Sequence, residues 1–324
     1  MERVRWLNFV AALNDVAAKN LLTLEEQIRQ AIGEDPFIFQ ACEPLFKGGK
    51  RLRPMLFLLC ANSKSNFPPE KSMPLAVTLE LIHTASLVHD DIIDTSKKRR
   101  GVETTNSKYG AQIAVLVGDY LFAKAFQLVA ENDYGAEVST TLSKLVKNLC
   151  VGEIMQDRSL YEVPTLNEYY TRINLKTAIF LSTCCRLGAI VSDMDRREVE
   201  NLTAYGSSLG LAFQIIDDLL DFFGDEKITG KPRGGDLKSG VITLPVLRAL
   251  EVSNEAPTLR KIVTSGQDVD AAIKIIQATD AIDYCRTRAE AHIESARVNL
   301  PLMLKPSVAR ALEQVADFIV DRTR

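Results

Sequence analysis

Helical periodicity is the feature of this sequence that most restricts its fold. After Ser72 and Pro74, which we expect to cap a helix and form its first turn, apolar residues recur at helical spacing up to an acidic cluster at 90–94. The period-two alternation of a half-buried strand is hard to find. The pattern therefore predicts an all-α fold of about ten or more helices. Similar spacing marks 111–130, 136–160, 166–192, 196–223, 241–252, 268–277 and 280–298.

Composition bounds the domain count and the kind of partner. The chain has 324 residues, is 46% hydrophobic and lacks a Pro- or Ser-rich linker, so we expect one domain over residues 1–324 with a sizeable core. A net charge of −3 excludes a general nucleic-acid binder, which would be strongly basic. Six scattered cysteines indicate reduced thiols, and three histidines argue against a His/Cys zinc site.

Targeting signals are not apparent in the sequence. The first twenty residues lack the uninterrupted apolar stretch of a secretory signal. The longest charge-free run, near residues 201–216, is too short and too polar to cross a bilayer. We therefore expect a cytoplasmic protein that is not embedded in a membrane, although its substrate could be a lipid.

Two DDxxD motifs carry the chemistry. The first contains Asp90, Asp91 and Asp94, and the second contains Asp217, Asp218 and Asp221. On a helix the outer aspartates of each motif share one face, where their like charges repel each other. Each motif sits in an apolar stretch, where uncompensated carboxylates are costly. Mg²⁺ resolves both problems, since it takes oxygen ligands and shares them with substrate phosphates.

Three glycine-containing basic segments complement the acidic motifs. They are Lys47–Pro54, Thr95–Gly110 and Gly224–Gly240, and the last two directly follow the acidic clusters. Arginine and lysine bind phosphate oxygens, and glycine lets the backbone approach a phosphate closely. One basic loop alone would be ordinary solvated surface. Together with two aspartate motifs, the three segments indicate a diphosphate site.

These motifs together resemble the trans-polyprenyl diphosphate synthase family, most clearly over residues 40–250. The resemblance implies the isoprenoid synthase fold, a helical bundle around a deep central cavity. It also implies condensation of isopentenyl diphosphate with an allylic diphosphate to a long all-trans product, and a homodimer. The motifs that carry it are GGKRLRP at 48–54, LIHTASLVHDDIID at 81–94, RRG at 99–101, GDYLFAKAF at 118–126, KT at 176–177, FQIIDDLLD at 213–221 and GKPRGGDLKSG at 230–240.

The resemblance also implies a role for each matching residue. The six aspartates would bind Mg²⁺, about three ions per active site, around the allylic diphosphate. Positions matching contacts to that diphosphate are Arg99, Lys176 and Lys231, which we expect to act in catalysis with the aspartates. Positions matching the isopentenyl diphosphate site are Lys50, Arg53, His83 and Arg100. Thr177 and Gln214 match polar residues near the reacting carbons.

One position departs from the family pattern. Many members have a lysine directly after the glycine of the last motif, whereas Val241 follows Gly240 here. Lys238 lies close by but precedes the glycine, so we do not assign it that role. His89 precedes the first aspartate, and we expect it to pack against or orient the metal-binding helix rather than act as a base.

Product length should depend on side chains that precede Asp90. Ala85 and Ser86 lie five and four residues before it. In the family, bulky aromatics at these positions stop the chain at farnesyl. Small residues leave the channel open, which implies a product of about 20 carbons or more. With Phe126 as the floor of a deep channel, the resemblance implies about 30 to 45 carbons. Ile82, Phe122 and Phe126 would be the next obstacles, and core packing is the other explanation for the two phenylalanines.

Three alternatives remain open from the sequence. The first is a shorter-chain synthase that makes geranylgeranyl or farnesyl diphosphate with the same catalytic residues. The second is the catalytic subunit of a heteromeric synthase. The third is a class I terpene cyclase, which usually pairs one DDxxD with a different metal motif that we do not find. Product analysis tests the first and the third, and activity of the purified chain alone decides the second.

Overall fold

The computed structural model describes residues 15–33, 35–46, 50–64, 68–99, 101–223 and 233–321. Within these ranges the regular structure is helical, apart from one antiparallel pair of two-residue strands, β1 (Lys98–Arg99) and β2 (Val102–Glu103). The six cysteines are free thiols. The expected all-α class is confirmed.

The chain divides into two compact units, and each is described by itself. The first comprises Met1–Val146, Cys184–Val199 and Met303–Ala311. The helices that lie wholly within it are α2 (Asp15–Ile32), α3 (Pro36–Phe46), α4 (Leu52–Ala61), α5 (Pro69–Ile93), α6 (Thr105–Tyr109) and α7 (Ala111–Glu131).

The second unit comprises Lys147–Thr183, Glu200–Leu302 and Leu312–Arg324. Its own elements are α9 (Leu166–Ile173), the π-helical segment η1 (Asn174–Ala178), α13 (Gly235–Lys238), α14 (Leu244–Val252), α15 (Ala256–Ser265), α16 (Val269–Gln277) and α17 (Ala281–Val298). Helices with residues in both units are α8 (Ala136–Arg158), α10 (Ile179–Val191), α11 (Arg196–Phe223) and α18 (Pro306–Asp321). One domain over residues 1–324 stays a prediction.

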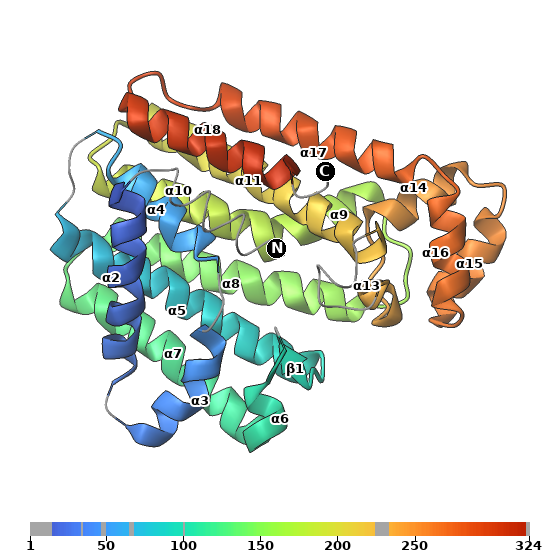
Figure 1. Ribbon diagram of the computed structural model, residues 1–324, viewed down its shortest axis with the longest axis horizontal. Coiled ribbons are helices and arrows are strands. Elements are labelled where there is room, and N and C mark those ends of the chain that lie inside the picture. Colours follow the sequence, from blue (N-terminus) through green and yellow to red (C-terminus); the bar gives the residue numbers. More distant parts are fainter. Residues whose placement is uncertain are drawn as a thin grey trace. The chain divides into compact units, whose positions relative to one another are not determined.

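The core of the first unit lies around α5. This helix runs alongside α7, as Figure 1 shows. Between them the buried Thr78 hydroxyl donates to the carbonyl oxygen of Ala125 at 3.2 Å. Leu79 and Ile82 on α5 and Leu121 on α7 are fully buried. Burying such side chains stabilises the fold by about 1.5–3 kcal/mol each, and it fixes which face of α5 remains available to a substrate.

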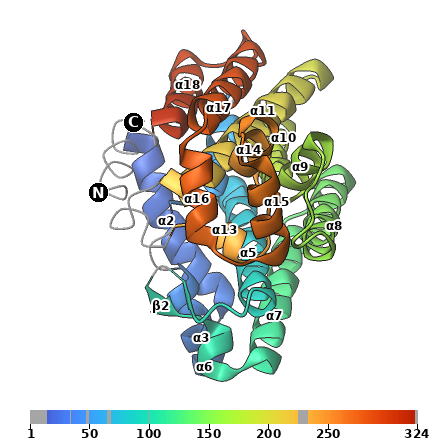
Figure 2. The ribbon, with the colours of Figure 1, turned by 90° about the vertical axis from the view of Figure 1, so that its right-hand side faces the viewer.

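The core of the second unit lies under the end of α11. Helices α14, α15 and α16 pack together there, as seen in Figure 2. Phe222 from the end of α11 and Leu237 from α13 are both fully buried in the apolar cluster formed with these helices. Because Phe222 directly follows Asp221, and Leu237 directly follows Asp236, the cluster anchors two acidic residues at its edge.

Two helix assignments differ from those expected. The helix predicted to start at Ser72 begins at Pro69, and Pro74 lies inside it. Proline suits the first helical position, where the missing N–H is not needed. The stretch 166–192 is not one uniform helix, because the five residues of η1 interrupt it. Single π-helical turns of this kind occur frequently at functional sites.

Candidate functional site

The first aspartate motif lies at the carboxyl end of α5. Asp90 is half-buried, Asp91 is buried and Asp94 is exposed, where it caps the helix. The amide of Asp94 donates to the carbonyl oxygen of Asp90 at 2.8 Å. Acidic groups are disfavoured at a helix carboxyl end, where the macrodipole is negative. A bound cation would offset both this effect and the repulsion between the carboxylates.

Arg99 contacts the buried member of this motif. The short β1–β2 hairpin carries Arg99 back toward α5, where its Nε lies 2.9 Å from Asp91 Oδ1 and 3.1 Å from Oδ2. The Asp91 side chain is only 2% exposed, whereas that of Arg99 is 30% exposed. Arg99 is therefore placed at the motif, with part of its guanidinium still accessible. Arg100 lies outside the described residues.

His89 packs on α7 rather than turning toward the aspartates. Its Nε2 lies 3.2 Å from the carbonyl oxygen of Val115, and its ring centroid is 5.9 Å from that of Phe122. Gly118 makes this approach possible, since a Cβ there would come within 2.1 Å of His89 Nε2. The imidazole thus fixes the end of α5 against α7, in line with an orienting role.

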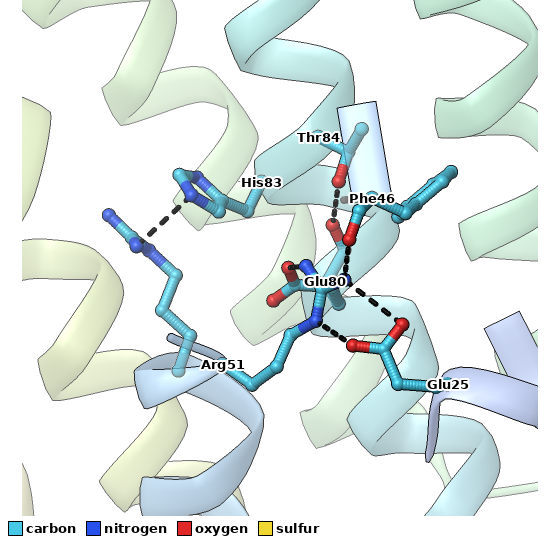
Figure 3. Close-up of polar contacts among 7 residues, drawn as sticks. Glu25, Phe46, Arg51, Glu80, His83 and Thr84 are labelled. Atoms are coloured by element: carbon cyan, nitrogen blue, oxygen red, sulfur yellow. Dashed lines mark hydrogen bonds and ion pairs between the residues drawn. The ribbon is translucent and has the colours of Figure 1, made fainter. Parts of the chain in front are cut away.

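A basic group lies where α4 begins. Arg53 Nη1 on α4 is 3.2 Å from Nε2 of His83 on α5, the histidine labelled in Figure 3. Arginine has no acceptor, so this hydrogen bond requires His83 to accept as the neutral imidazole. Lys50 lies three residues before Arg53 and is half-buried. The structure therefore brings together two of the four residues expected at the isopentenyl diphosphate site, with Lys50 close in sequence and Arg100 outside the described residues.

The residues expected to set product length lie on α5 and α7. Ile82 and Ala85 are fully buried. Ser86 is half-buried, and its hydroxyl donates to the carbonyl oxygen of His83 at 2.8 Å. Phe122 and Phe126 occupy one face of α7, four residues apart, and both are half-buried. Their control of product length stays a prediction.

The second aspartate motif lies near the carboxyl end of α11. Asp217 and Asp221 are half-buried and Asp218 is buried. The carboxylate of Asp221 accepts hydrogen bonds from the amides of Gly235 at 3.1 Å and Asp236 at 3.2 Å. These amides belong to the short helix α13, so the chain that follows α11 folds back onto its own acidic motif.

A chain of hydrogen bonds runs through Asp218. The Thr177 hydroxyl donates to Gln214 Oε1 at 2.6 Å, and Gln214 Nε2 donates to Asp218 Oδ1 at 2.8 Å. The hydroxyl of the fully buried Tyr169 donates to Asp218 Oδ2 at 2.7 Å. Two residues expected near the reacting carbons are thereby linked to the second motif.

The pKa of Asp218 reflects this environment. Burial, followed by the nearby charge of Asp236, raises the pKa to about 8, although hydrogen bonds from Gln214 and Tyr169 and the charge of Arg172 act in the opposite direction. The carboxylates of Asp218 and Asp236 therefore lie close enough for the charge of one to disfavour the charge of the other. A divalent cation would relieve that repulsion.

Lys176 occupies the π-helical segment η1. Its Nζ lies 2.6 Å from Glu153 Oε2 on α8, and both side chains are largely buried, with 26% and 15% exposure. The close approach of α8 to η1 depends on Gly152, because a Cβ there would lie 2.9 Å from Leu175 Cβ. Lys231, the other lysine expected at the allylic diphosphate, lies outside the described residues.

Three residues at this site were not identified from the sequence. Glu153 and Tyr169 are recognisable only once α8 and α9 are packed beside η1 and α11. Asp236 had a weak signal, since it is an acid among glycines and bases in the stretch 230–240. An isolated acid in a basic loop is ordinary, so its place beside Asp218 required the fold.

The donor set of both motifs fits Mg²⁺. It consists of carboxylate oxygens, which this ion prefers, and sulfur or imidazole ligands are not part of it. Among the described residues, no three acidic, histidine or cysteine side chains converge tightly enough to hold a metal by themselves. Mg²⁺ commonly takes one or two carboxylates from a protein and completes its shell with water and substrate phosphate.

Comparison with known proteins identifies the family. Residues 35–279 match the Polyprenyl synthetase family. The chain is 35% identical to a solanesyl-diphosphate synthase from Oryza sativa, over 97% of this chain and 80% of that protein. It is also 35% identical to heptaprenyl diphosphate synthase component 2 from Bacillus subtilis, over 92% and 87% of the two chains. A short chain isoprenyl diphosphate synthase from Methanocaldococcus jannaschii is 35% identical as well, over 94% and 95%.

Solved structures show the same fold. A decaprenyl diphosphate synthase from Rhodobacter capsulatus superposes with a TM-score of 0.88 at 32% identity, covering 97% of this chain and 99% of that one. A polyprenyl synthase from Caulobacter crescentus, complexed with calcium and isoprenyl diphosphate, gives a TM-score of 0.88 at 31% identity, covering 97% and 98%. The chain therefore belongs to the polyprenyl synthetase family, and it is a trans-prenyltransferase with the all-α fold that its sequence predicts.

Proposed function

We propose that this enzyme uses Mg²⁺ to condense isopentenyl diphosphate with an allylic diphosphate, and that it makes an all-trans product of about 30 to 45 carbons. The observation that carries the proposal is the pair of aspartate motifs, each held by its own hydrogen bonds. Arg99 contacts the first motif, and the Thr177–Gln214 pair is hydrogen-bonded to the second. The relatives with solanesyl, heptaprenyl and decaprenyl names support a long product.

The reaction breaks a carbon–oxygen bond and a carbon–hydrogen bond and forms a carbon–carbon bond. The carbon–oxygen bond of the allylic diphosphate ionises, and the alkene of isopentenyl diphosphate attacks the resulting cation to form a carbon–carbon bond. A proton then leaves the new cation, and the released diphosphate can accept it. Bound Mg²⁺, about three ions per active site with motif aspartates as ligands, would supply Lewis-acid stabilisation of the leaving diphosphate.

The protein's own residues bind and orient the two substrates. Lys176 would bind the leaving diphosphate as a point charge. Its ion pair with Glu153 fixes the position of the ammonium group beside η1. The oxygen atoms of Thr177 and Gln214 present partial negative charge near the developing cation. Arg53, His83 and Lys50 would bind the diphosphate of isopentenyl diphosphate, which takes no part in the bond changes.

Alanine substitution of one aspartate in each motif tests the proposal. In Asp90→Ala and Asp217→Ala we expect turnover with saturating Mg²⁺ to fall by about two orders of magnitude or more, with unchanged far-UV circular dichroism. The control is Asp270→Ala, which changes an exposed helical aspartate in the second unit. Wild-type turnover in either motif variant would rule out the metal assignment.

Two other activities share these residues. A shorter-chain synthase is favoured by the similarity to the short chain isoprenyl diphosphate synthase. A subunit of a heteromeric synthase is favoured by the similarity to a protein named component 2. Product sizing decides the first, and activity of the purified chain alone decides the second.

We further propose a homodimer that works in the cytoplasm. Its support is the apolar surface of α7, where Val115 and Leu116 are 42% and 57% exposed. Helices α7 and α9–α10 are long and apolar enough to cross a membrane by composition, but core helices of water-soluble proteins meet the same criterion. A second copy of the chain would cover the exposed face of α7.

A further inference from the structure

Arg51 lies between Lys50 and Arg53, yet its side chain turns into the protein. It directly precedes α4 with φ 51° and ψ 31°, in the left-handed region that residues other than glycine rarely adopt. Its side chain is only 4% exposed. A strained backbone of this kind persists only where surrounding contacts hold it. The contacts of the guanidinium therefore explain why arginine occupies this position.

Three acceptor groups surround the Arg51 guanidinium, as Figure 3 shows. Nε donates to Glu25 Oε1 at 2.7 Å and Nη2 donates to Oε2 of the same carboxylate at 3.1 Å. Nη1 donates to Glu80 Oε1 at 2.5 Å, and Nη2 also donates to the carbonyl oxygen of Phe46. The start of α4 is thereby tied to α2, to the end of α3 and to α5.

Glu80 connects this cluster to the basic group. It is buried on α5, one turn before His83, so the two side chains lie on the same helix face. Arg51 contacts Glu80, and Arg53, two residues later, contacts His83 at 3.2 Å. The two contacts join the same pair of helices side by side. Because the Arg51–Glu80 contact is buried, it sets the separation at which Arg53 and His83 meet.

We propose that Arg51 is a positioning residue for isopentenyl diphosphate. Its buried pairing with Glu80 and Glu25 holds Lys50 and Arg53 where they bind the diphosphate, and Arg51 itself does not touch the substrate. This rests on the proposed function, in which Lys50, Arg53 and His83 form that subsite. A lysine cannot replace the guanidinium, because an ammonium lacks the planar fork that reaches all three acceptor groups at once.

The test is steady-state kinetics of Arg51→Lys with each substrate varied in turn. We expect KM for isopentenyl diphosphate to rise about 10-fold, with KM for the allylic diphosphate and kcat changed less than about 2-fold. A general loss of structure would change all three. Arg186→Lys is the matched control, because Arg186 forms an exposed ion pair with Glu137 in the same unit. An unchanged KM, or equal rises for both substrates, would overturn the proposal.

Arg53→Ala separates this proposal from the one on which it depends. If that variant leaves KM for isopentenyl diphosphate unchanged, the subsite assignment fails. If Arg53→Ala raises KM and Arg51→Lys does not, only the positioning role fails. Should Arg51→Lys not fold, Glu25→Gln weakens the same cluster at a carboxylate that is 44% exposed. Glu25→Gln should raise KM for isopentenyl diphosphate selectively, by about 3-fold. An unchanged KM would overturn the positioning role of Arg51.

Discussion

At the scale of single residues, the middle aspartate of each motif differs from its neighbours. Asp91 and Asp218 are 1% and 2% exposed, and the outer aspartates are more accessible. Arg99 contacts both carboxylate oxygens of Asp91, and Tyr169 and Gln214 each donate to one oxygen of Asp218. We interpret the middle residues as supports that fix the helix turn from which the outer carboxylates reach a cation.

Tyr169→Phe tests this support in the second motif. The substitution removes the hydroxyl that donates to Asp218 and leaves a buried oxygen without that donor. We expect the free energy of unfolding, measured with denaturant, to fall by about 1–3 kcal/mol, and turnover to fall about 10-fold. Tyr170→Phe is the control, since that half-buried ring packs on His292. Equal stability of Tyr169→Phe and the wild type would contradict a supporting role.

Aromatic substitution before Asp90 tests the control of product length. We expect Ala85→Phe to shorten the product, because a ring there would block a channel along α5. Ala85 is fully buried, so overpacking should cost about 1–3 kcal/mol. Ser86→Phe is the gentler variant, since position 86 keeps some exposure. Chromatography of the dephosphorylated products measures their length. Unchanged product lengths in both active variants would contradict the proposed channel.

At the scale of elements, η1 shows how packing overrides a local pattern. The sequence 166–192 predicts one helix, and its helical bounds are nearly those observed. Within it, the backbone widens into a π turn that presents Lys176 and Thr177 beside α8 and α11. The turn is associated with the close approach of Gly152, a tertiary contact that spacing along the chain cannot reveal.

Gly152→Ala tests the link between α8 and η1. The added methyl would lie 2.9 Å from Leu175 Cβ and 3.0 Å from Lys176 Cγ, so η1 or α8 must shift. We expect about 1–3 kcal/mol of lost stability and at least about a 10-fold loss of turnover. The control Lys147→Ala, at an exposed position on the same helix, should lower neither stability nor turnover. Full activity in Gly152→Ala would show that the position of η1 does not matter for catalysis.

Regular elements and acidic motifs were accessible from the sequence, but their supporting contacts were not. Helix α11 has the predicted bounds, because apolar residues recur at helical spacing along it without interruption, up to and through the acidic motif. Asp236 and Arg51 escaped notice for a common reason. Each acts through residues distant in the chain, Asp236 beside Asp218 and Arg51 between Glu25 and Glu80. Spacing along one helix cannot identify such partners.

At the scale of the whole molecule, the surface of α7 favours association. Val115 and Leu116 on this helix are 42% and 57% exposed, although the helix has the composition of a core element. We expect Leu116→Glu to convert the proposed dimer to a monomer, because a charge would enter an apolar interface. Light scattering after size-exclusion chromatography measures the mass.

Two results would contradict the dimer. The first is a monomeric wild-type chain. The second is a dimer that Leu116→Glu leaves intact. Association of the wild type with lipid vesicles, lost in the same variant, would instead assign this face to a membrane. Asp119→Asn is the matched control, since it removes a charge from an exposed position on α7 without adding one.

The central claim is chain elongation by this protein, and product sizing tests it most directly. The purified chain is incubated with labelled isopentenyl diphosphate, allylic primers of several lengths and Mg²⁺. We expect label in all-trans products of about 30 to 45 carbons, with activity lost in EDTA. Cyclic hydrocarbons formed without consumption of isopentenyl diphosphate, or no incorporation by the chain with any primer, would contradict the account.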